Sequence, residues 1–451
     1  MAKKILLVNP WICDLAAYDL WMFPLGLLNI AQHLQYDQRI KLYFLDFLDR
    51  SEYASLKIKK DHSQTSSYGT GNFFKQEIPR PASLTKVPRP FFRYGIPKSI
   101  IERKLKNIKP DLILLTSGMT YWYLGVLATV ELLRKNFKDC PIILGGIYAS
   151  LAPEHAKENI HTDYVFAGND IKEVLRCISQ YLGFKLEARY DAYHRPAIEL
   201  LRQKTVLPIS GSRGCPFRCV YCASRLLQRR FEQNDPQQIL GYIQYCIEKL
   251  KTTDLVFYDD ALLVNADNFI KPILRSVIGK KWKVRFHTPN GLHAKFIDEE
   301  LAILMYRSNF KTVRLSLEST LNSIQDKSNK KVTNRQLKDA VKLLGKAGFK
   351  KQDVGIYTML GFPDQTEQDV QRDMEFVYGL GAQIQLASYS LVPGTDQWHE
   401  FTKKGILNKN TDLLELSHTA FPLIFSKFNT HTIRRLRQRA SELNKLKTPA
   451  L

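Results

Sequence analysis

The feature that most constrains this chain of 451 residues is a group of three closely spaced cysteines, Cys215, Cys219 and Cys222. They follow a short apolar run at residues 206–209, which is typical of a strand, and they lie on a loop rich in glycine. A structural zinc takes four protein ligands, and an electron-transfer iron–sulfur cluster takes four cysteines. Three cysteines therefore indicate a metal centre with one position open for a substrate or cofactor. A zinc site completed by a histidine, or chance clustering, fits the same spacing.

Length and composition indicate a globular protein of several domains. A chain of 451 residues predicts two or three domains, and 44% hydrophobic with 24% charged residues is an ordinary globular composition. No apolar run approaches the roughly 18 residues of a membrane span. The apolar start at residues 5–8 favours a buried strand over a signal peptide. We therefore expect a cytoplasmic protein, a compartment whose reducing conditions suit thiolate ligands.

The net charge of +22 allows an anionic partner without identifying one. The densest basic region is the tail, 401–451, where four arginines (Arg434, Arg435, Arg437 and Arg439) fall on an expected final helix. A solvated basic helix is favoured over a nucleic-acid surface, because the other basic residues are spread along the chain.

The first 183 residues alternate short apolar runs with amphipathic stretches, which predicts a doubly wound α/β domain of Rossmann type. Strands are expected at 5–8, 42–45, 112–115, 142–144 and 164–166, and helices at 25–34, 124–133, after Pro153 and at 174–182. An insert at about 50–100 is either a lid or clamp, or a surface excursion. Residues 184–204 lose the periodicity and are predicted to be a linker.

The alternation resumes after the cysteines and predicts a second parallel sheet. Strands are expected at 206–209, 255–258, 284–286, 313–317, 354–358 and 385–388, with polar residues directly after most of them. Six such units predict a partial (β/α)6 barrel over 205–398. Barrel enzymes place their chemistry at the carboxyl ends of the strands. A basic helical region, 399–451, follows, with helices expected near 398–401, 413–417 and 433–446.

The cysteine spacing resembles the motif of the radical S-adenosylmethionine (SAM) superfamily, because an aromatic residue, Tyr221, directly precedes Cys222. The resemblance implies that the three cysteines bind three irons of a [4Fe-4S] cluster and that SAM chelates the fourth. It further implies reductive cleavage of SAM to a 5′-deoxyadenosyl radical, with an electron donor such as flavodoxin or ferredoxin.

The same resemblance suggests roles for residues at the strand ends. Tyr258, Asp259 and Asp260 stand where relatives contact the amino group of SAM. Glu318 matches a carboxylate that accepts hydrogen bonds from the ribose, and the backbone of Tyr221 contacts adenine. The alternation of side chains along a strand brings Ser316 to the same face as Glu318 and Arg314, so that Ser316 is a further cofactor-binding candidate.

Several polar residues of the second sheet are candidates for contact with the substrate. The catalytic candidates are Tyr258, Asp259, His287, Tyr357 and Tyr389. Four of them have a structural alternative: Asp259 as a helix N-cap, His287 as a capping or satisfied surface histidine, and Tyr357 and Tyr389 as packing residues.

The first domain resembles the cobalamin-binding domain that precedes many radical SAM domains. The resemblance rests on Asn9-Pro10, on Pro24-Leu25-Gly26-Leu27, and on the strand-end segments Ser117-Gly118-Met119 and Gly145-Gly146. It implies that these two strand-end segments, with Gly168, line the cobalamin. The motif that supplies a histidine to cobalt is absent, since residues 11–23 contain no histidine, and Gly168-Asn169-Asp170 replaces the acidic turn of relatives.

These observations predict a cobalamin-dependent radical SAM enzyme that methylates an unactivated carbon of a small-molecule or peptide substrate. A radical SAM rearrangement or cyclisation, with or without cobalamin, is the alternative. A tRNA methylthiotransferase is disfavoured because Cys13, Cys140 and Cys177 do not match its second cluster. A non-catalytic sensor of SAM or cobalamin is disfavoured by the intact cysteine motif. Nucleic acid is not the favoured partner.

Overall fold

A computed structural model describes residues 2–55, 67–189 and 195–446. The chain divides into two compact units. Unit 1 comprises residues 1–85, 89–204 and 412–414, and unit 2 comprises 86–88, 205–411 and 415–451. Each unit is built on a parallel sheet of its own.

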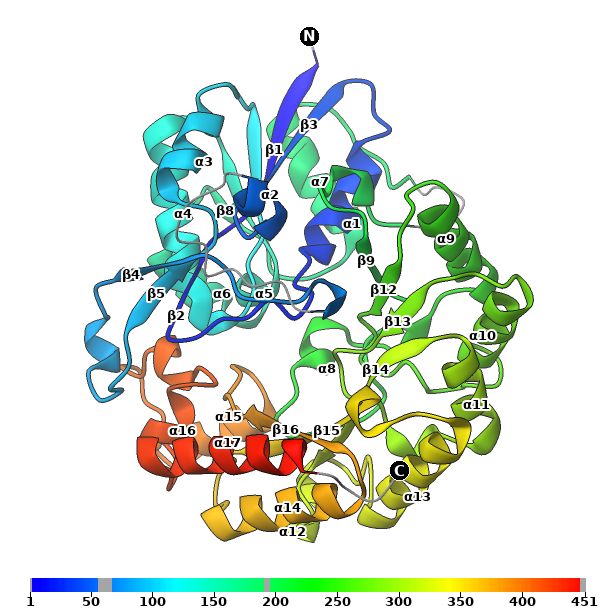
Figure 1. Cartoon of the computed structure of the whole chain (residues 1–451). Helices are drawn as coiled ribbons and strands as arrows, with labels where there is room; N and C mark the ends of the chain where they lie inside the picture. Colours follow the sequence, from blue (N-terminus) through cyan, green and yellow to red (C-terminus); the bar gives the residue numbers. More distant parts are fainter. Residues whose placement is uncertain (1, 56–66, 190–194, 447–451) are drawn as a thin grey trace. The chain divides into compact units, whose positions relative to one another are not determined.

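Unit 1 contains a five-stranded parallel sheet in the order β3-β1-β6-β7-β8 (Figure 1). The strands are β1 (Lys3–Asn9), β3 (Ile40–Asp46), β6 (Leu112–Leu115), β7 (Ile142–Leu144) and β8 (Tyr164–Val165). The central strands are apolar throughout, as expected of strands covered on both faces. The order reverses beside β1, so the loops after β1 and β6 diverge at the edge where doubly wound sheets bind ligands.

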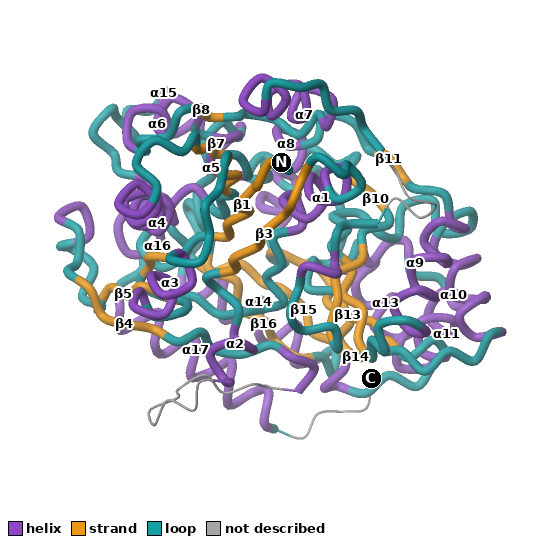
Figure 2. Tube along the Cα trace, turned by 90° about the horizontal axis from the view of Figure 1, so that it is seen from above, coloured by secondary structure: helices purple, strands orange, loops and turns teal. Residues whose placement is uncertain are grey.

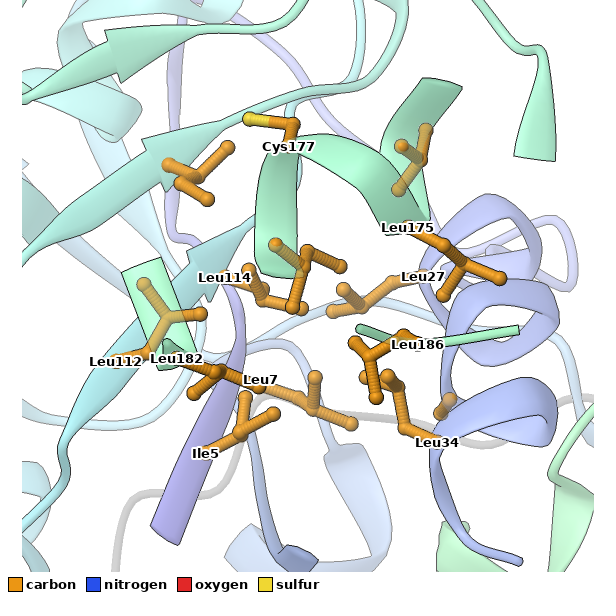
Figure 3. Close-up of a cluster of buried hydrophobic side chains, with 14 of the residues drawn as sticks. Ile5, Leu7, Leu27, Leu34, Leu112, Leu114, Leu175, Cys177, Leu182 and Leu186 are labelled. Carbon is orange, nitrogen blue, oxygen red and sulfur yellow. The ribbon is translucent and has the colours of Figure 1, made fainter. Parts of the chain in front are cut away.

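Two helices pack their apolar stripes on one face of this sheet. They are α1 (Leu25–Leu34) and α7 (Ile171–Leu182). Figure 3 shows Leu27 and Leu34 of α1 and Leu175 and Leu182 of α7 around β-strand residues such as Leu114. Asp170 caps the start of α7, its carboxylate accepting hydrogen bonds from two backbone amides, and Gly183 ends the helix in a left-handed conformation.

Residues expected to form a linker also contribute to this core. Leu186 and Ala197 are buried in the cluster with α1 and α7, and Leu186 is among the side chains in Figure 3. Unit 1 accordingly extends to residue 204. A short 3₁₀ turn, Ile198–Leu200, lies within this stretch.

The insert supplies two strands of a small antiparallel sheet that the sequence did not indicate. Its order is β2-β5-β4, with bounds β2 (Ile12–Asp14), β4 (Lys75–Ile78) and β5 (Phe91–Tyr94). The loop after β1 thereby pairs with the insert. Trp11 is fully buried beneath it and donates its indole N–H to the Ile96 carbonyl at 2.7 Å. The insert also contributes helix α3 (Lys98–Leu105), and helix α2 (Arg50–Ser55) lies at its start. Part of the expected insert, 56–66, lies outside the described residues.

Unit 2 contains a six-stranded, all-parallel sheet in the order β9-β12-β13-β14-β15-β16. The strands are β9 (Val206–Ile209), β12 (Asp254–Phe257), β13 (Arg285–His287), β14 (Phe310–Glu318), β15 (Val354–Leu360) and β16 (Gln383–Ser388). Chain order equals sheet order, as in a succession of right-handed strand–helix units.

Helices cover the apolar face of this second sheet. They are α9 (Pro236–Glu248), α10 (Ile270–Gly279), α11 (Glu299–Arg307), α13 (Asn334–Ala347) and α14 (Glu367–Gly379). In Figures 1 and 2, α9, α10 and α11 run side by side along the strands β12 to β14.

The C-terminal helix α17 (Thr430–Lys445) packs on α14 and on the edge strand β16. The side-chain amide of Asn444 bonds the Ile384 backbone twice: its oxygen accepts from the amide at 2.8 Å, and its nitrogen donates to the carbonyl at 3.0 Å. Two of the tail arginines attach α17 to neighbouring elements of unit 2. Arg435 pairs with Glu367 of α14 in a bidentate contact, and Arg437 donates to Ser388 of β16. The basic character of this helix is thus partly committed to intramolecular contacts.

The predicted strands and main helices of both sheets are confirmed to within a few residues. The α/β class with parallel sheets is likewise confirmed. The expected helix near 413–417 is a 3₁₀ turn, Leu413–Leu416. Within the described residues, no helix has the length and apolarity needed to cross a membrane.

Candidate functional site

The three motif cysteines lie on the loop between β10 (Ser212–Arg213) and α8 (Ser224–Leu227). β10 pairs with β11 (Glu232–Gln233), which closes the loop into a hairpin. Gly214 has φ +74°, and a Cβ there would lie 2.7 Å from the Arg230 carbonyl oxygen. Glycine is therefore required at this position for both backbone conformation and space.

The three motif cysteines form no disulfide, and they differ in solvent exposure. Cys215 and Cys219 are half-buried, and Cys222 is exposed. The Cys219 thiol donates to the Ser328 carbonyl at 3.3 Å, and the Cys222 thiol contacts the Ser224 hydroxyl at 3.4 Å. Burial raises the pKa of Cys215 to about 11, and the neighbouring thiols and Asp260 add to this effect.

These residues fit a three-cysteine cluster site. In the described part of the chain, no three potential ligands converge on a single point as they would around one ion. A [4Fe-4S] cluster does not require such convergence, because each cysteine binds a different iron. The three thiols act on one another electrostatically and come from one loop with open access at Cys222. Three thiols on one loop are compatible with the three-cysteine donor set of such a cluster.

The cysteine loop is attached to the strand ends of unit 2 by buried polar contacts. Asp259, directly after β12, accepts hydrogen bonds from the Ser212 hydroxyl at 2.6 Å and the Gly211 amide at 3.1 Å. The Val220 amide donates to the Lys327 carbonyl, and the Gln397 amide donates to the Val220 carbonyl. Burial raises the pKa of Asp259 to about 6. Asp259 accordingly supports the loop, and the alternative of a helix cap is not what the structure contains.

Asp260 lies next to the loop with its carboxylate on the accessible side. One oxygen accepts from the Ser224 hydroxyl at 2.6 Å, and the other lies 3.4 Å from the Asn290 amide nitrogen. Asn290 also donates to the Tyr258 carbonyl at 3.0 Å, which fixes the strand end. The candidates Tyr258, Asp259 and Asp260 are therefore brought to the cysteine loop together.

Glu318 forms a buried ion pair with Lys331, a residue that the sequence did not single out. The two side chains are 11% and 9% exposed. Glu318 has φ +68°, and the pairing of β14 with β15 shifts register between Ser316 and Glu318. The predicted alternation from Ser316 to Glu318 is therefore interrupted by a bulge, a feature that commonly redirects a side chain. Burial lowers the pKa of Lys331, but Glu318 and Cys219 outweigh burial and raise it overall.

Tyr221 packs against a row of aromatic side chains. The Tyr221 ring meets Phe362 edge-on with 5.9 Å between the ring centroids, and the centroids of Phe362 and Tyr389 are 5.0 Å apart. Lys331 lies 5.8 Å from the Tyr221 ring centre. Burial, followed by Glu318 and Cys219, raises the pKa of the Tyr221 hydroxyl well above its ordinary value. Tyr221, Glu318, Lys331 and Cys219 thus form one group. Tyr389 is 5% exposed and packs in the aromatic row.

His287 and Tyr357 lie on the polar face of the second sheet. His287 is fully buried, and both ring nitrogens are engaged, with Asp254 at 2.8 Å and Thr312 at 3.0 Å. Its surroundings are those of a satisfied structural histidine. Tyr357 is half-buried and donates its hydroxyl to the Pro289 carbonyl at 2.8 Å.

The expected cobalamin edge of unit 1 is assembled around Ser117. Its hydroxyl donates to the Gly145 carbonyl at 2.6 Å, and its carbonyl accepts from the Ile147 amide at 2.9 Å. A Cβ on Gly146 would lie 2.4 Å from the Ser117 carbonyl oxygen, so this turn requires glycine. A Cβ on Gly145 would meet nothing within 4 Å. The edge therefore has an open approach to the backbone at Gly145.

The remaining residues of that set flank the turn. Gly118 packs under the Trp122 ring, which a Cβ would meet at 2.7 Å, and Met119 begins the 3₁₀ turn Thr120–Trp122. The Gly168 amide donates to the Ser150 hydroxyl at 3.1 Å. Ser117, Gly118, Met119, Gly145, Gly146 and Gly168 thus follow three neighbouring strands of one sheet.

Comparison with protein families gives a match over the second sheet. Residues 209–377 match the model of the radical SAM superfamily, and this range contains the cysteine loop and Glu318. The chain thus contains a radical SAM domain. It is therefore an enzyme whose cofactors are SAM and a [4Fe-4S] cluster.

Curated relatives of this radical SAM chain include an uncharacterised methyltransferase of Pyrococcus horikoshii. It is 24% identical over 336 residues, which cover 66% of this chain and 71% of the relative. A probable threonylcarbamoyladenosine tRNA methylthiotransferase of the same organism is 26% identical over 42% of this chain and 45% of its own length. The anaerobic magnesium-protoporphyrin IX monomethyl ester cyclase of Rubrivivax gelatinosus is 20% identical over 67% of this chain and 60% of its own length.

Two solved structures resemble the fold of this radical SAM chain over nearly its whole length. The radical SAM methyltransferase TsrM of Kitasatospora setae, with tryptophan and a SAM analogue bound, superimposes with a TM-score of 0.66 at 13% identity. That match covers 99% of this chain and 89% of TsrM. The cobalamin-dependent radical enzyme OxsB gives a TM-score of 0.56 at 14% identity, covering 98% of this chain and 61% of OxsB.

Proposed function

We propose that this radical SAM chain is a cobalamin-dependent methyltransferase acting on an unactivated carbon of a small molecule. The observation that supports it most is the group formed by the cysteine loop, Asp260, and the buried pair Glu318–Lys331. Radical rearrangement or cyclisation of such a substrate is the alternative, supported by the cyclase among the relatives.

Within this proposal the residues have distinct tasks. When bound, the cluster supplies the electron that cleaves SAM to a 5′-deoxyadenosyl radical, and cobalamin supplies the methyl group. Cys215, Cys219 and Cys222 would hold the cluster through three irons. Asp260 would bind the amino group of SAM, and Glu318 would accept hydrogen bonds from the ribose hydroxyls, a pairing suited to a carboxylate. Lys331 supplies the counter-charge of Glu318 inside the protein.

Three observations support cobalamin as the second cofactor. The Ser117 turn and the glycine pair meet at one sheet edge, the approach to Gly145 is open, and the neighbouring Ile147 remains 37% exposed. A large, flat cofactor with an apolar face suits such an edge. A TsrM structure holds cobalamin and a [4Fe-4S] cluster, which is the same cofactor set.

A tRNA methylthiotransferase is the less favoured function. Such enzymes match between 42% and 59% of this chain, so it is the cysteines outside the motif that weigh against this function. Cys177 packs in the hydrophobic core of unit 1 (Figure 3), Cys13 is buried in β2, and Cys140 donates to the Pro110 carbonyl. The three cysteines thus come from β2, from the turn before β7 and from α7, and each has a structural environment of its own.

We further propose the domain roles and the partners. Residues 1–183 act as the cobalamin-binding domain, 205–398 as a partial (β/α)6 radical SAM barrel, and 399–451 as a basic helical extension. A flavodoxin- or ferredoxin-like protein delivers the electron in the cytoplasm. Nucleic acid is not the favoured partner, because Arg435 and Arg437 are engaged within unit 2.

Oxygen-free reconstitution tests this function. The chain is loaded with iron, sulfide and cobalamin, passed through gel filtration, and then reduced in the presence of SAM. We expect about four irons per chain, retained cobalamin, and formation of 5′-deoxyadenosine. Absence of corrin after filtration would remove the cobalamin assignment, and absence of 5′-deoxyadenosine would remove the radical assignment.

A pair of cysteine variants controls the experiment. Cys219→Ala is expected to lose iron and SAM cleavage. Cys140→Ala, a half-buried cysteine outside the motif, is expected to retain both. Equal iron content in the two variants would contradict the cluster site.

A further inference from the structure

The polar face of the second sheet is continuous across its central strands. Strand pairing places on one face Asp254, Arg285, His287, Thr312, Arg314, Ser316, Gly355, Tyr357, Gln383 and Gln385. The opposite face carries apolar residues such as Val313, Leu315 and Ile356, which are fully buried. On the polar face Arg314, Tyr357 and Gln385 are half-buried.

The side chain of Arg314 extends over strand β15, because the β15 residue paired with Arg314 is a glycine. Arg314 pairs with Gly355, and a Cβ on Gly355 would lie 2.8 Å from Nη1 of Arg314 and 3.0 Å from Cγ of Gln385. Glycine inside a strand weakens it and often marks a place where another group must approach closely. Here it makes room for the guanidinium and for Gln385.

Arg314 has no counter-ion on this face. Asp254 is bound by Arg285 through two contacts of 2.6 Å and by His287. Glu318 is paired with Lys331. In the part of the chain that the structure describes, Arg314 forms no salt bridge; the hydroxyl of Tyr357 interacts with the guanidinium, but Nη1 is buried with no hydrogen-bond acceptor. The side-chain amide of Gln385 likewise makes no hydrogen bond there.

An uncompensated guanidinium in such a place is costly. Arginine stays protonated in proteins, so it cannot escape the cost by neutralisation. A buried charge without a partner is destabilising by several kcal/mol. The arrangement is therefore that of a site whose missing partner is a ligand.

We propose that Arg314 binds a carboxylate of the substrate, with Gln385 as a neighbouring amide donor. The proposal rests on the proposed function and names its substrate class: a small carboxylic acid. The planar guanidinium matches a carboxylate geometrically, and a single cation suits a monoanion better than a phosphate dianion. Arg314 precedes Glu318 by four residues on β14, roughly 13 Å of strand. A substrate held there extends toward the strand ends, where SAM is expected.

Ligand-observed NMR titration tests the proposal with matched acids and amides. The probes are acetate, benzoate, phenylacetate, indole-3-acetate and hippurate, each with its carboxamide, together with inorganic phosphate. We expect at least one acid to bind about tenfold more tightly than its amide, since hydrogen bonds to a charged group contribute about 1.5 kcal/mol or more. The titration uses the oxygen-free reconstituted chain with SAM, and is repeated on the chain without a cluster.

Four variants identify the residue responsible. Arg314→Gln removes the charge, and Gly355→Ala displaces the guanidinium without removing it; both are expected to abolish the preference for acid. Arg307→Gln, an exposed arginine of α11, and Gly279→Ala, whose Cβ would meet nothing within 4 Å, are the controls expected to retain it. Iron content and unfolding temperature check that each variant is folded.

Several results would overturn the proposal. They are equal binding of every acid and amide by the wild type, an acid preference that survives in Arg314→Gln, or tighter binding of phosphate than of any acid. A loss of SAM affinity in Arg314→Gln at unchanged iron content would instead assign the guanidinium to SAM. Because the cluster-free chain is titrated separately, failure to bind iron or cleave SAM is distinguishable from failure to bind the acid.

Discussion

Lys331 and Glu318 illustrate how a buried charge pair is both a stability element and a functional one. Removing one partner leaves the other charge buried and unpaired, which costs about 3 kcal/mol or more. We expect Lys331→Met to lower the free energy of unfolding by that amount. In Lys331→Met/Glu318→Gln much of the loss should be recovered, because neither charge remains. Urea denaturation of the cluster-free proteins measures both values.

The adjacent lysine provides the matched control. Lys330 is 75% exposed and pairs with the exposed Asp326, so Lys330→Met should change stability by less than about 0.5 kcal/mol. Strictly additive losses in the double variant would show that the two buried charges do not depend on each other.

Asp254 predicts a pH dependence of stability. Burial raises its pKa, but hydrogen bonds from Arg285, His287 and Thr253 outweigh burial and lower it well below its ordinary 3.8. A depressed pKa stabilises the fold above pH 3.8, and this contribution is lost as the pH falls further. Asp254→Asn should therefore be less stable than the wild type at pH 7, and the difference should shrink below pH 4. Denaturation midpoints between pH 3 and pH 7 test this, and a constant difference would contradict it.

Single residues show where sequence reasoning succeeds. Cys215, Cys219 and Cys222 are neighbours in the chain, so their meeting on one loop required no knowledge of the fold. Lys331 could not be identified, because only tertiary packing distinguishes it among 66 lysines and arginines. His287 was a candidate for contact with substrate because it follows a strand. Its burial between Asp254 and Thr312 depends on the register of three strands, which the sequence does not specify.

At the scale of elements, two helical glycines of unit 1 should respond to replacement by alanine with stability changes of opposite sign. Gly125 lies in α4 (Tyr123–Asn136), where a Cβ would lie 2.0 Å from the Trp11 carbonyl oxygen. Gly26 lies in α1, where a Cβ would meet nothing within 4 Å. Gly125→Ala should lose at least about 2 kcal/mol by overpacking, whereas Gly26→Ala should gain about 0.5 kcal/mol through helix propensity. Urea denaturation gives both signs, and a neutral Gly125→Ala would refute the close packing of α4 on the loop after β1.

The parallel sheets were predictable as elements, while the β2-β5-β4 sheet was not. The former consist of apolar runs separated by amphipathic helices, a pattern that is local in sequence. The latter joins strands of three or four residues from positions 12–14, 75–78 and 91–94. Such short strands carry little periodicity, and their pairing is set by the burial of Trp11 and Phe91 after the insert has folded back.

At the scale of the whole molecule, the chain divides into two compact units, each with a parallel sheet of its own, so we expect two unfolding transitions in calorimetry. Gly125→Ala should lower only one of them. Leu344→Ala, a fully buried residue of α13, should lower the other through a cavity that costs about 3 kcal/mol. A single transition shifted by both variants would show that the units unfold as one.

The hydrogen bonds from Asn444 to the backbone of Ile384 have a consequence for the behaviour of the protein in concentrated solution. An open parallel sheet ends in strands whose unpaired backbone groups can add a strand from another molecule. On β16 an amide side chain occupies that position in place of a further strand. Loss of helix α17 by proteolysis, or its detachment on heating, would expose this edge as a template for intermolecular strand addition.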